Sequence, residues 1–215
     1  GLRVASMPVL TRLYDPAALG IFGFYLTVVA IAGGLACGRC DQAVMLPRRQ
    51  RDAASLLVLS LWLAVISGGV AGLIMLATGE PLLAWAGLAD ARVLLWLLPG
   101  GIAASAAFTA LSAWAQRGKD FGGLARANIV QSASMAGAQA SLGMLRIPGG
   151  LLGGHVAGTL LGGARLARRI WRADGALLRS SSSWRRMRAQ ARIHRSFPLY
   201  SAPVAVLTTL SAQLP

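Results

Sequence analysis

Apolar residues form long blocks along this 215-residue chain, instead of the alternating apolar and polar faces of a water-soluble helix. Four blocks contain no Asp, Glu, Lys or Arg, and they are 17–37, 53–78, 93–115 and 127–145. Each block is about long enough to cross a hydrocarbon core of ~30 Å, because a helix rises about 1.5 Å per residue. The pattern therefore predicts four membrane-spanning helices.

Three further stretches extend this prediction. Residues 149–164 are apolar and glycine-rich, and they predict a short fifth span. Residues 1–10 and 198–215 have the composition of partial spans, so we expect a chain truncated at both ends. Only 13% of residues are charged and the mean hydropathy is +0.59, whereas soluble domains carry about a quarter charged residues. The expected fold is all-α, a single polytopic transmembrane helical bundle.

The stretch PGGLLGGHVAGTLLGGARLARRIWR, residues 148–172, is rich in glycine and then in arginine. In water, each helical glycine costs about 1 kcal/mol relative to alanine. In lipid, small residues let two helix backbones approach closely. Gly150, Gly154 and Gly158 recur every four residues, with Gly162 next, and predict a seam packed against a neighbouring helix. We expect the span to end before the arginines, which reach the membrane surface.

The net charge of +14 is concentrated in alternate loops. The segments 38–52, 116–126 and 165–197 hold 17 of the 21 Lys and Arg residues. The positive-inside rule therefore places all three on the cytoplasmic side. The basic connector 165–197, with Trp171 and Trp184 at the interface, is expected to be attracted to an anionic phospholipid surface. No aromatic stacking platform or groove-reading motif accompanies the arginines, which argues against nucleic acid as a partner.

His155 is the only acidic or basic side chain well inside a predicted span. Such a residue is a candidate proton relay or substrate contact. The alternative is a neutral, structural histidine bonded to a polar group of a neighbouring helix, for which Gln131 and Gln139 are available. Cys37 and Cys40 lack a second ligand pair and a βαβ context, so neither a metal nor another cofactor is expected.

Three strings resemble segments of a known family. The first, LTRLYDPAALGIFGFYLTVV at 10–29, is similar to the segment joining the first two helices of bacterial polysaccharide flippases. The second, RCDQAVMLPRRQRDAASLLVLSL at 39–61, resembles the next characteristic run of that family. The third, HRSFPLYSAPVAVLTTLSAQLP at 194–215, resembles the entry to its seventh helix. The resemblance is to the oligosaccharide flippase branch of the multidrug/oligosaccharidyl-lipid/polysaccharide exporter superfamily.

The resemblance implies the N-terminal half of a two-lobed transporter, with one six-helix lobe present. It implies movement of an undecaprenyl-diphosphate-linked oligosaccharide from the inner to the outer leaflet of the bacterial inner membrane, for surface polysaccharides such as the O-antigen of lipopolysaccharide. The implied partner is that lipid-linked oligosaccharide, with other polysaccharide-assembly membrane proteins as further candidates. Flipping breaks no covalent bond, so no enzymatic activity is expected. The family places 10–16 outside and 38–52 inside, in agreement with the arginine distribution.

Moving a diphosphate through a low-dielectric region calls for fixed cations, which makes arginines at span ends the candidate substrate-binding residues. The candidate arginines are Arg39, Arg12, Arg126 and Arg3, and the neighbouring Asp41 is a further candidate. Arg39 is the first choice, because it lies between two apolar stretches and belongs to the second resembling string. One departure from the family is that Cys40 and Asp41 stand where an aromatic residue and Glu are usual.

Other classes of membrane protein stay open. A multidrug cation antiporter of the same superfamily needs a carboxylate deep in the helices, and none of the seven acidic residues lies there. A membrane-embedded glycan polymerase or lipid-processing enzyme needs clustered acids, histidine pairs or arginines in the outer loops, which here are short and hold single charges. Only the three strings disfavour a purely structural membrane subunit.

Overall fold

A computed structural model describes residues 14–36, 44, 50–85, 93–145, 147 and 149–181 of the chain. Within these residues the protein is helical, with no strand. The helices are α2 (Pro16–Ala36), α4 (Gln50–Trp85), α5 (Val93–Arg117), α6 (Phe121–Met144) and α7 (Gly150–Ser181). The all-α expectation is confirmed for the described part of the chain.

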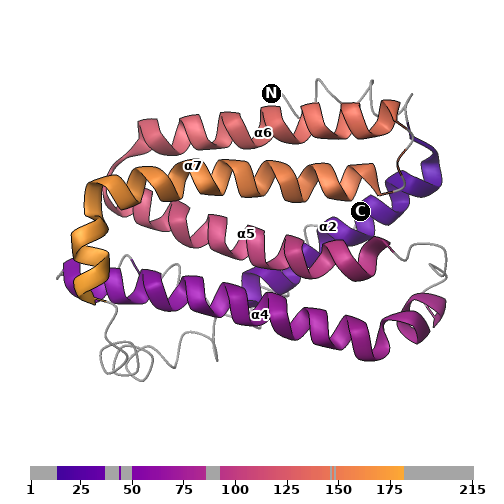
Figure 1. Cartoon of the computed structure of the whole chain (residues 1–215), viewed down its shortest axis with the longest axis horizontal. Coiled ribbons are helices and arrows are strands. Elements are labelled where there is room, and N and C mark those ends of the chain that lie inside the picture. The colour runs from indigo at the N-terminus through magenta and orange to yellow at the C-terminus, as the bar shows by residue number, and fades with distance from the viewer. Residues whose placement is uncertain are drawn as a thin grey trace.

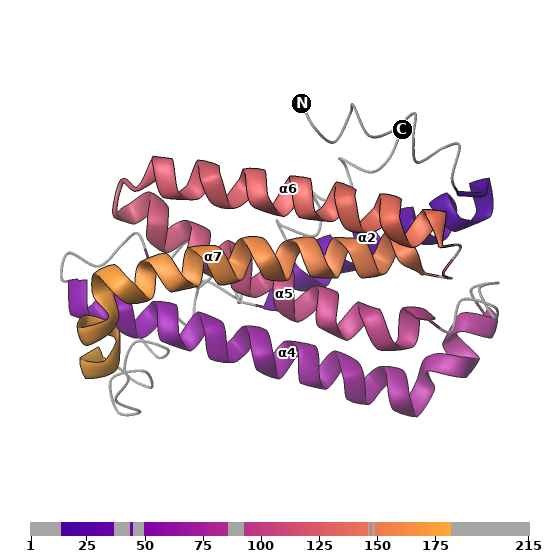
Figure 2. The same ribbon diagram turned by 45° about the horizontal axis from the view of Figure 1, so that its top comes forward.

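The helices run side by side as an elongated bundle, with α7 packed between α6 and α5 and with α4 on the far side (Figures 1 and 2). Helices α4 to α7 alternate in direction along the chain. The starts of α4 and α6 therefore lie at the same end as the ends of α5 and α7, at the left of Figure 1. This end, which we call the basic end, holds 116–126 and the described parts of the other two segments in which the sequence concentrates its arginines, 50–52 and 165–181.

Among the described residues, three helices are long and apolar enough to cross a membrane: Pro16–Gly34, Gln50–Pro81 and Val93–Arg117. Helix α4 also exposes a row of large apolar side chains that suits hydrocarbon rather than water. They are Trp62, Val65, Ile66, Val70, Leu73, Ile74 and Leu76. The chain is therefore a membrane protein. Helices α6 and α7 are less apolar because Ser, Gln and Gly fill α6 and arginines fill the second half of α7.

The glycine seam lies where the sequence predicted it, and its partner is α6. A Cβ atom built on Gly158 would lie 2.6 Å from the Cβ of Met135 and 2.8 Å from the carbonyl oxygen of Gln131. One on Gly162 would lie 3.1 Å from the carbonyl oxygen of Ala127. Since real Cβ contacts are rarely this short, only glycine permits the observed approach of the two backbones.

Helix α7 differs from its prediction in length. The sequence ended this helix near residue 164, whereas the structure continues it through the arginines to Ser181. The reason is a stripe of apolar residues at helical spacing: Leu166, Ile170 and Leu178 are buried in a core cluster shared with α4 and α5. Near its end the helix bends and crosses the basic end toward the start of α4 (Figure 1). The first part of the predicted connector 165–197 is thus helical.

Candidate functional site

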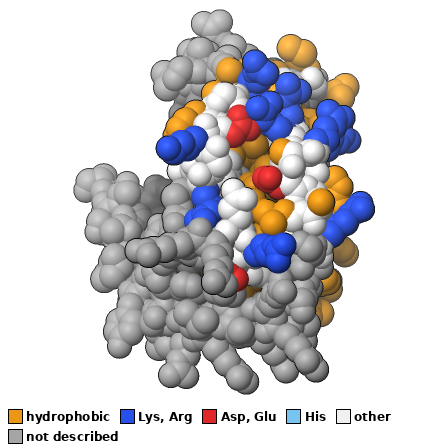
Figure 3. Space-filling model, turned by 90° about the vertical axis from the view of Figure 1, so that its left-hand side faces the viewer, with side chains coloured by type: hydrophobic (Ala, Val, Ile, Leu, Met, Phe, Trp, Pro, Cys, Tyr) orange, Lys and Arg blue, Asp and Glu red, His pale blue; other side chains and the backbone are white. Residues whose placement is uncertain are grey.

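A groove of about 1690 Å³ opens at the basic end, lined by the end of α5, the α5–α6 turn, the first half of α6 and the second half of α7. Its cations are Arg117, Lys119, Arg126, Arg165, Arg168, Arg169 and Arg172, and its acidic residues are Asp120 and Asp174. Seen end-on in Figure 3, the Lys and Arg side chains gather around the few acidic ones. The groove therefore carries a net positive charge.

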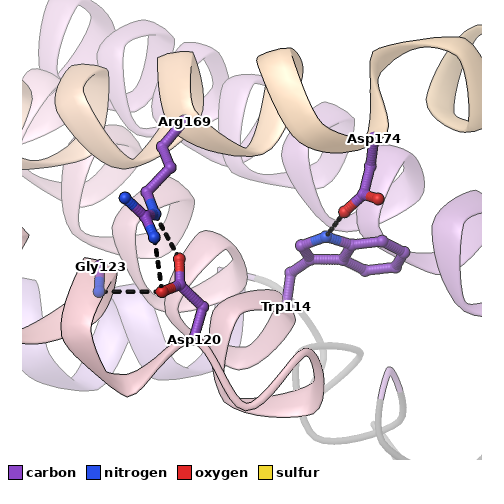
Figure 4. Close-up of polar contacts among 5 residues, drawn as sticks. All are labelled: Trp114, Asp120, Gly123, Arg169 and Asp174. Atoms are coloured by element: carbon purple, nitrogen blue, oxygen red, sulfur yellow. Dashed lines mark hydrogen bonds and ion pairs between the residues drawn. The ribbon is translucent and has the colours of Figure 1, made fainter.

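Asp120 joins two helices at this groove. Its Oδ1 atom accepts a hydrogen bond of 3.0 Å from the backbone N–H of Gly123, which caps the start of α6. The same carboxylate accepts two bonds from the guanidinium of Arg169 on α7, with Nη2 2.9 Å from Oδ1 (Figure 4). The bond from Arg169 holds the pKa of Asp120 below its usual value, with the Gly123 bond acting in the same direction.

Asp174, the other acidic residue of the groove, is held by α5. Its Oδ2 atom accepts a hydrogen bond of 3.0 Å from the indole Nε1 of Trp114, a largely buried residue (Figure 4). Arg117, at the end of α5, donates from Nη1 to the carbonyl oxygen of Val44 at 2.9 Å. These bonds join the ends of α5 and α7 to each other and to the segment before α4.

Four arginines in the groove keep their charge available. Both acidic residues are occupied by the bonds just described, and Arg169 is paired with Asp120. Arg126, Arg165, Arg168 and Arg172 form no hydrogen bond or ion pair with any residue in the described ranges. Because charge-assisted bonds to phosphate are among the strongest that arginine forms, this arrangement is suited to a phosphate-bearing ligand.

The groove has two parts with different linings. The end part, around the α5–α6 turn and the bend of α7, is polar and contains Arg168 and Arg172. The side part runs along the α6–α7 seam, where Arg126 lies one and two turns before Val130 and Ser134 on one face of α6. Across the seam, Leu161 precedes Arg165 by one turn of α7. The side part is thus apolar toward the middle of the bundle and cationic toward its basic end.

The buried polar side chains of α6 and α7 are hydrogen-bonded to neighbouring helices. The Nδ1 atom of His155 lies 3.1 Å from the hydroxyl oxygen of Tyr25 on α2, and the two rings meet edge to face. Gln131 donates to Thr159 at 3.3 Å, and Gln139 donates to the carbonyl oxygen of Leu151 at 3.0 Å. The neighbouring-helix partner of His155 is therefore a tyrosine of α2, while the two glutamines bond other groups of α7.

Of the predicted site residues, the structure places two, and it does not bring them together. Arg126 lies exposed near the start of α6, at the basic end, whereas His155 is buried near the start of α7, toward the opposite end. Arg3, Arg12, Arg39 and Asp41 lie outside the described residues, as do Cys37 and Cys40. The expected roles of these residues stay predictions.

Sequence reasoning missed three residues that organise the site: Tyr25, Asp120 and Asp174. Asp120 had a local signal, because an acidic residue directly before the first turn of a helix is a common cap. Its pairing with Arg169, 49 positions away, had none. Tyr25 looked like one more aromatic residue in an apolar span until α2 and α7 were seen side by side.

Comparisons of the chain with protein-family models, with curated proteins and with solved structures found no match. The resemblance to polysaccharide flippases therefore depends on the three sequence strings alone. What the geometry adds is a membrane-suited bundle with a cationic groove at one end, in which the acidic residues are already bonded.

Proposed function

We propose that this protein moves a lipid-linked oligosaccharide across the bacterial inner membrane, with the basic end in the cytoplasm. The observation that carries the proposal is the groove at that end, where Arg168 and Arg172 are free of described partners beside occupied carboxylates. The orientation follows from the positive-inside rule. Apolar helices that suit a membrane and the three flippase-like strings support the same function.

The physical task of such a transporter is to bring a diphosphate out of water without paying its full desolvation cost. Fixed guanidinium groups replace the water hydrogen bonds of the phosphate oxygens, and their geometry matches those oxygens well. In the end part of the groove, the turn holding Asp120 and the bonded Asp174 keep the surrounding backbone in place. The cations therefore meet the incoming anion without first having to break an ion pair of their own.

A multidrug cation antiporter is the main alternative within the same superfamily. Such a protein needs a carboxylate in the middle of a span to bind its cation. In the spans that the structure describes, the acidic residues are Asp52 and Glu80, both near the ends of α4. This placement favours an anionic substrate over a cationic one.

The test is rescue of surface polysaccharide in a bacterial strain that lacks its own flippase. We expect the unaltered protein to restore the polysaccharide and the variant R168A/R172A to lower recovery at least about tenfold, because each lost phosphate contact is charge-assisted. The variant R168K/R172K retains part of the activity, since the charge remains while the planar fork is lost.

The matched control is R51A, which removes an exposed arginine from the same end of the bundle but outside the groove. It is expected to rescue as well as the unaltered protein. Absence of rescue by correctly inserted unaltered protein contradicts the proposed function. Equal losses in R51A and R168A/R172A contradict the role of the groove but not the function itself.

A further inference from the structure

The side part of the groove has a composition that the transport of a diphosphate does not require. Arg126 of α6 and Arg165 of α7 face it from the two sides of the seam. Their near neighbours Ala127 and Gly162 are in close backbone contact, since a Cβ on Gly162 would lie 3.1 Å from the carbonyl oxygen of Ala127. The two arginines therefore start from backbone positions on either side of one narrow seam.

Apolar surface continues from these arginines toward the middle of the bundle. Leu161 on α7 is 53% exposed and lines the groove one turn before Arg165. Val130 on α6, one turn after Arg126, lines the groove from the other side of the seam. In a membrane, hydrocarbon chains cover such a surface, whereas a water-soluble phosphate leaves it bare.

We propose that the side part of this groove binds one acidic phospholipid of the inner leaflet, with its headgroup phosphate between Arg126 and Arg165 and its acyl chains along Leu161 and Val130. Basic pockets between helices on the cytoplasmic side are the usual place for acidic headgroups. One phosphodiester meets two arginines that form no hydrogen bond or ion pair with a described residue. A bilayer presents acidic phospholipid to this surface continuously, so occupancy does not depend on cargo.

This site is separate from the proposed function, and it assigns Arg126 to a resident lipid. The sequence had offered Arg126 as a contact for incoming substrate. Arg126 lies one turn before the apolar Val130 in the groove lining, near the start of α6, which suits a lipid headgroup with acyl chains beside it. The end part, with Arg168 and Arg172, remains open to a cargo diphosphate while a phospholipid occupies the side part.

The experiment uses the purified protein in phosphatidylcholine nanodiscs that contain a minor fraction of phosphatidylglycerol. Native mass spectrometry counts the phosphatidylglycerol that stays bound after the disc is removed. The unaltered protein is expected to retain it, and R126Q/R165Q is expected to retain at least about tenfold less, because each arginine near the membrane surface adds substantially to binding of an acidic lipid. Each single variant shows a smaller loss.

The matched control is R51Q/R179Q, which removes the same charge from the described basic end outside the groove. It is expected to keep the bound lipid. Equal losses in both double variants overturn the proposal, because attraction is then diffuse. No loss in R126Q/R165Q overturns it as well.

Two further measurements test whether the variant is folded and whether cargo lipid competes for the site. Unfolding temperatures in pure phosphatidylcholine are expected to be the same for the unaltered protein and R126Q/R165Q, so that lost lipid does not reflect lost folding; if the double variant is less stable, the single variants decide. A polyprenyl diphosphate added in competition is expected to leave the bound phosphatidylglycerol in place. Displacement by that lipid assigns the side part to cargo and overturns the proposal.

Discussion

The two halves of α7 have opposite compositions and are stabilised in different ways, although they form one continuous helix. From Gly150 to residue 164 the helix is uncharged and rich in glycine, and it lies so close to α6 that a Cβ atom on its seam glycines would meet α6 at less than normal contact distance. From Arg165 to Ser181 it carries five arginines, most of them exposed around the groove, and it bends across the end of the bundle. The first half is stabilised by backbone contact and the second by a narrow apolar stripe.

This difference shows that the effect of a residue type on helix stability depends on its surroundings. Glycine weakens a helix in water because it adds backbone entropy to the unfolded state, but it strengthens a helix pair in lipid when it allows contact. Arginine is costly within hydrocarbon and inexpensive at its edge. In the proposed membrane orientation, the boundary between the halves of α7 is expected near the level at which the surroundings change from helix and lipid to headgroup and water.

The strongest test of the first half is the substitution Gly158→Ala. Its added methyl group would meet both Met135 and the backbone of Gln131, so we expect a loss of about 1–3 kcal/mol in the free energy of unfolding. Unfolding in detergent by a graded denaturant measures it. The control Gly137→Ala places a methyl group in open space on α6 and is expected to be neutral or slightly stabilising. Similar effects of both substitutions would mean that the seam is not close-packed in the membrane.

The second test concerns the Tyr25–His155 pair, the polar contact that joins α2 to the first half of α7. Hydrogen bonds between membrane helices average about 0.6 kcal/mol in double-mutant cycles, and we expect a coupling of that size between Tyr25→Phe and His155→Gln. Rescue of surface polysaccharide by His155→Gln should be intact if the histidine is structural. Complete loss of transport with unchanged stability would instead support a proton relay.

The smallest expected effect belongs to the exposed Asp120–Arg169 pair in the second half. Because the pKa of Asp120 in the folded protein lies below its ordinary value of 3.8, the pair stabilises the fold above that pH, and the stabilisation is lost as the pH falls through the lowered pKa. We expect Asp120→Asn to lower the unfolding temperature slightly at neutral pH, since asparagine still caps α6. The difference from the unaltered protein should close in acid. A difference that persists at the lowest pH would point to the cap rather than the ion pair.

Periodicity along the chain was sufficient to predict the seam of α7, since glycines every four residues specify one face whatever the partner. It did not identify α6 as that partner, because nothing local in Met135 or Gln131 indicates a neighbour 23 or more positions away. The end of α7 was misjudged for a physical reason. Arginine density marks the limit of the membrane, but the helix continues wherever an apolar stripe such as Leu166 and Ile170 finds a core to bury in.

For the site, the sequence predicted that the charge would be positive but not which arginines would be available. Counting arginines located the basic end, and Arg126 does line its groove. Which arginines stay available depends on where Asp120 and Asp174 lie. Their bonds arise from the packing of α7 against α6 and α5 rather than from spacing in the sequence. The hydroxyl of Tyr25 is similar: its importance comes from a neighbour 130 positions along the chain.

The carboxylate of Asp120 caps the start of α6 and is also bonded to Arg169 of α7. If α7 were to slide or rotate against α6, Arg169 would move away from Asp120, and the ion pair at the first turn of α6 would be lost. The glycine seam opposes the same displacement along its length, because the backbones of α6 and α7 are already in close contact there. In any conformational change of this protein, α6 and α7 should therefore move together as one rigid body, and the movement should occur at their contacts with the other helices.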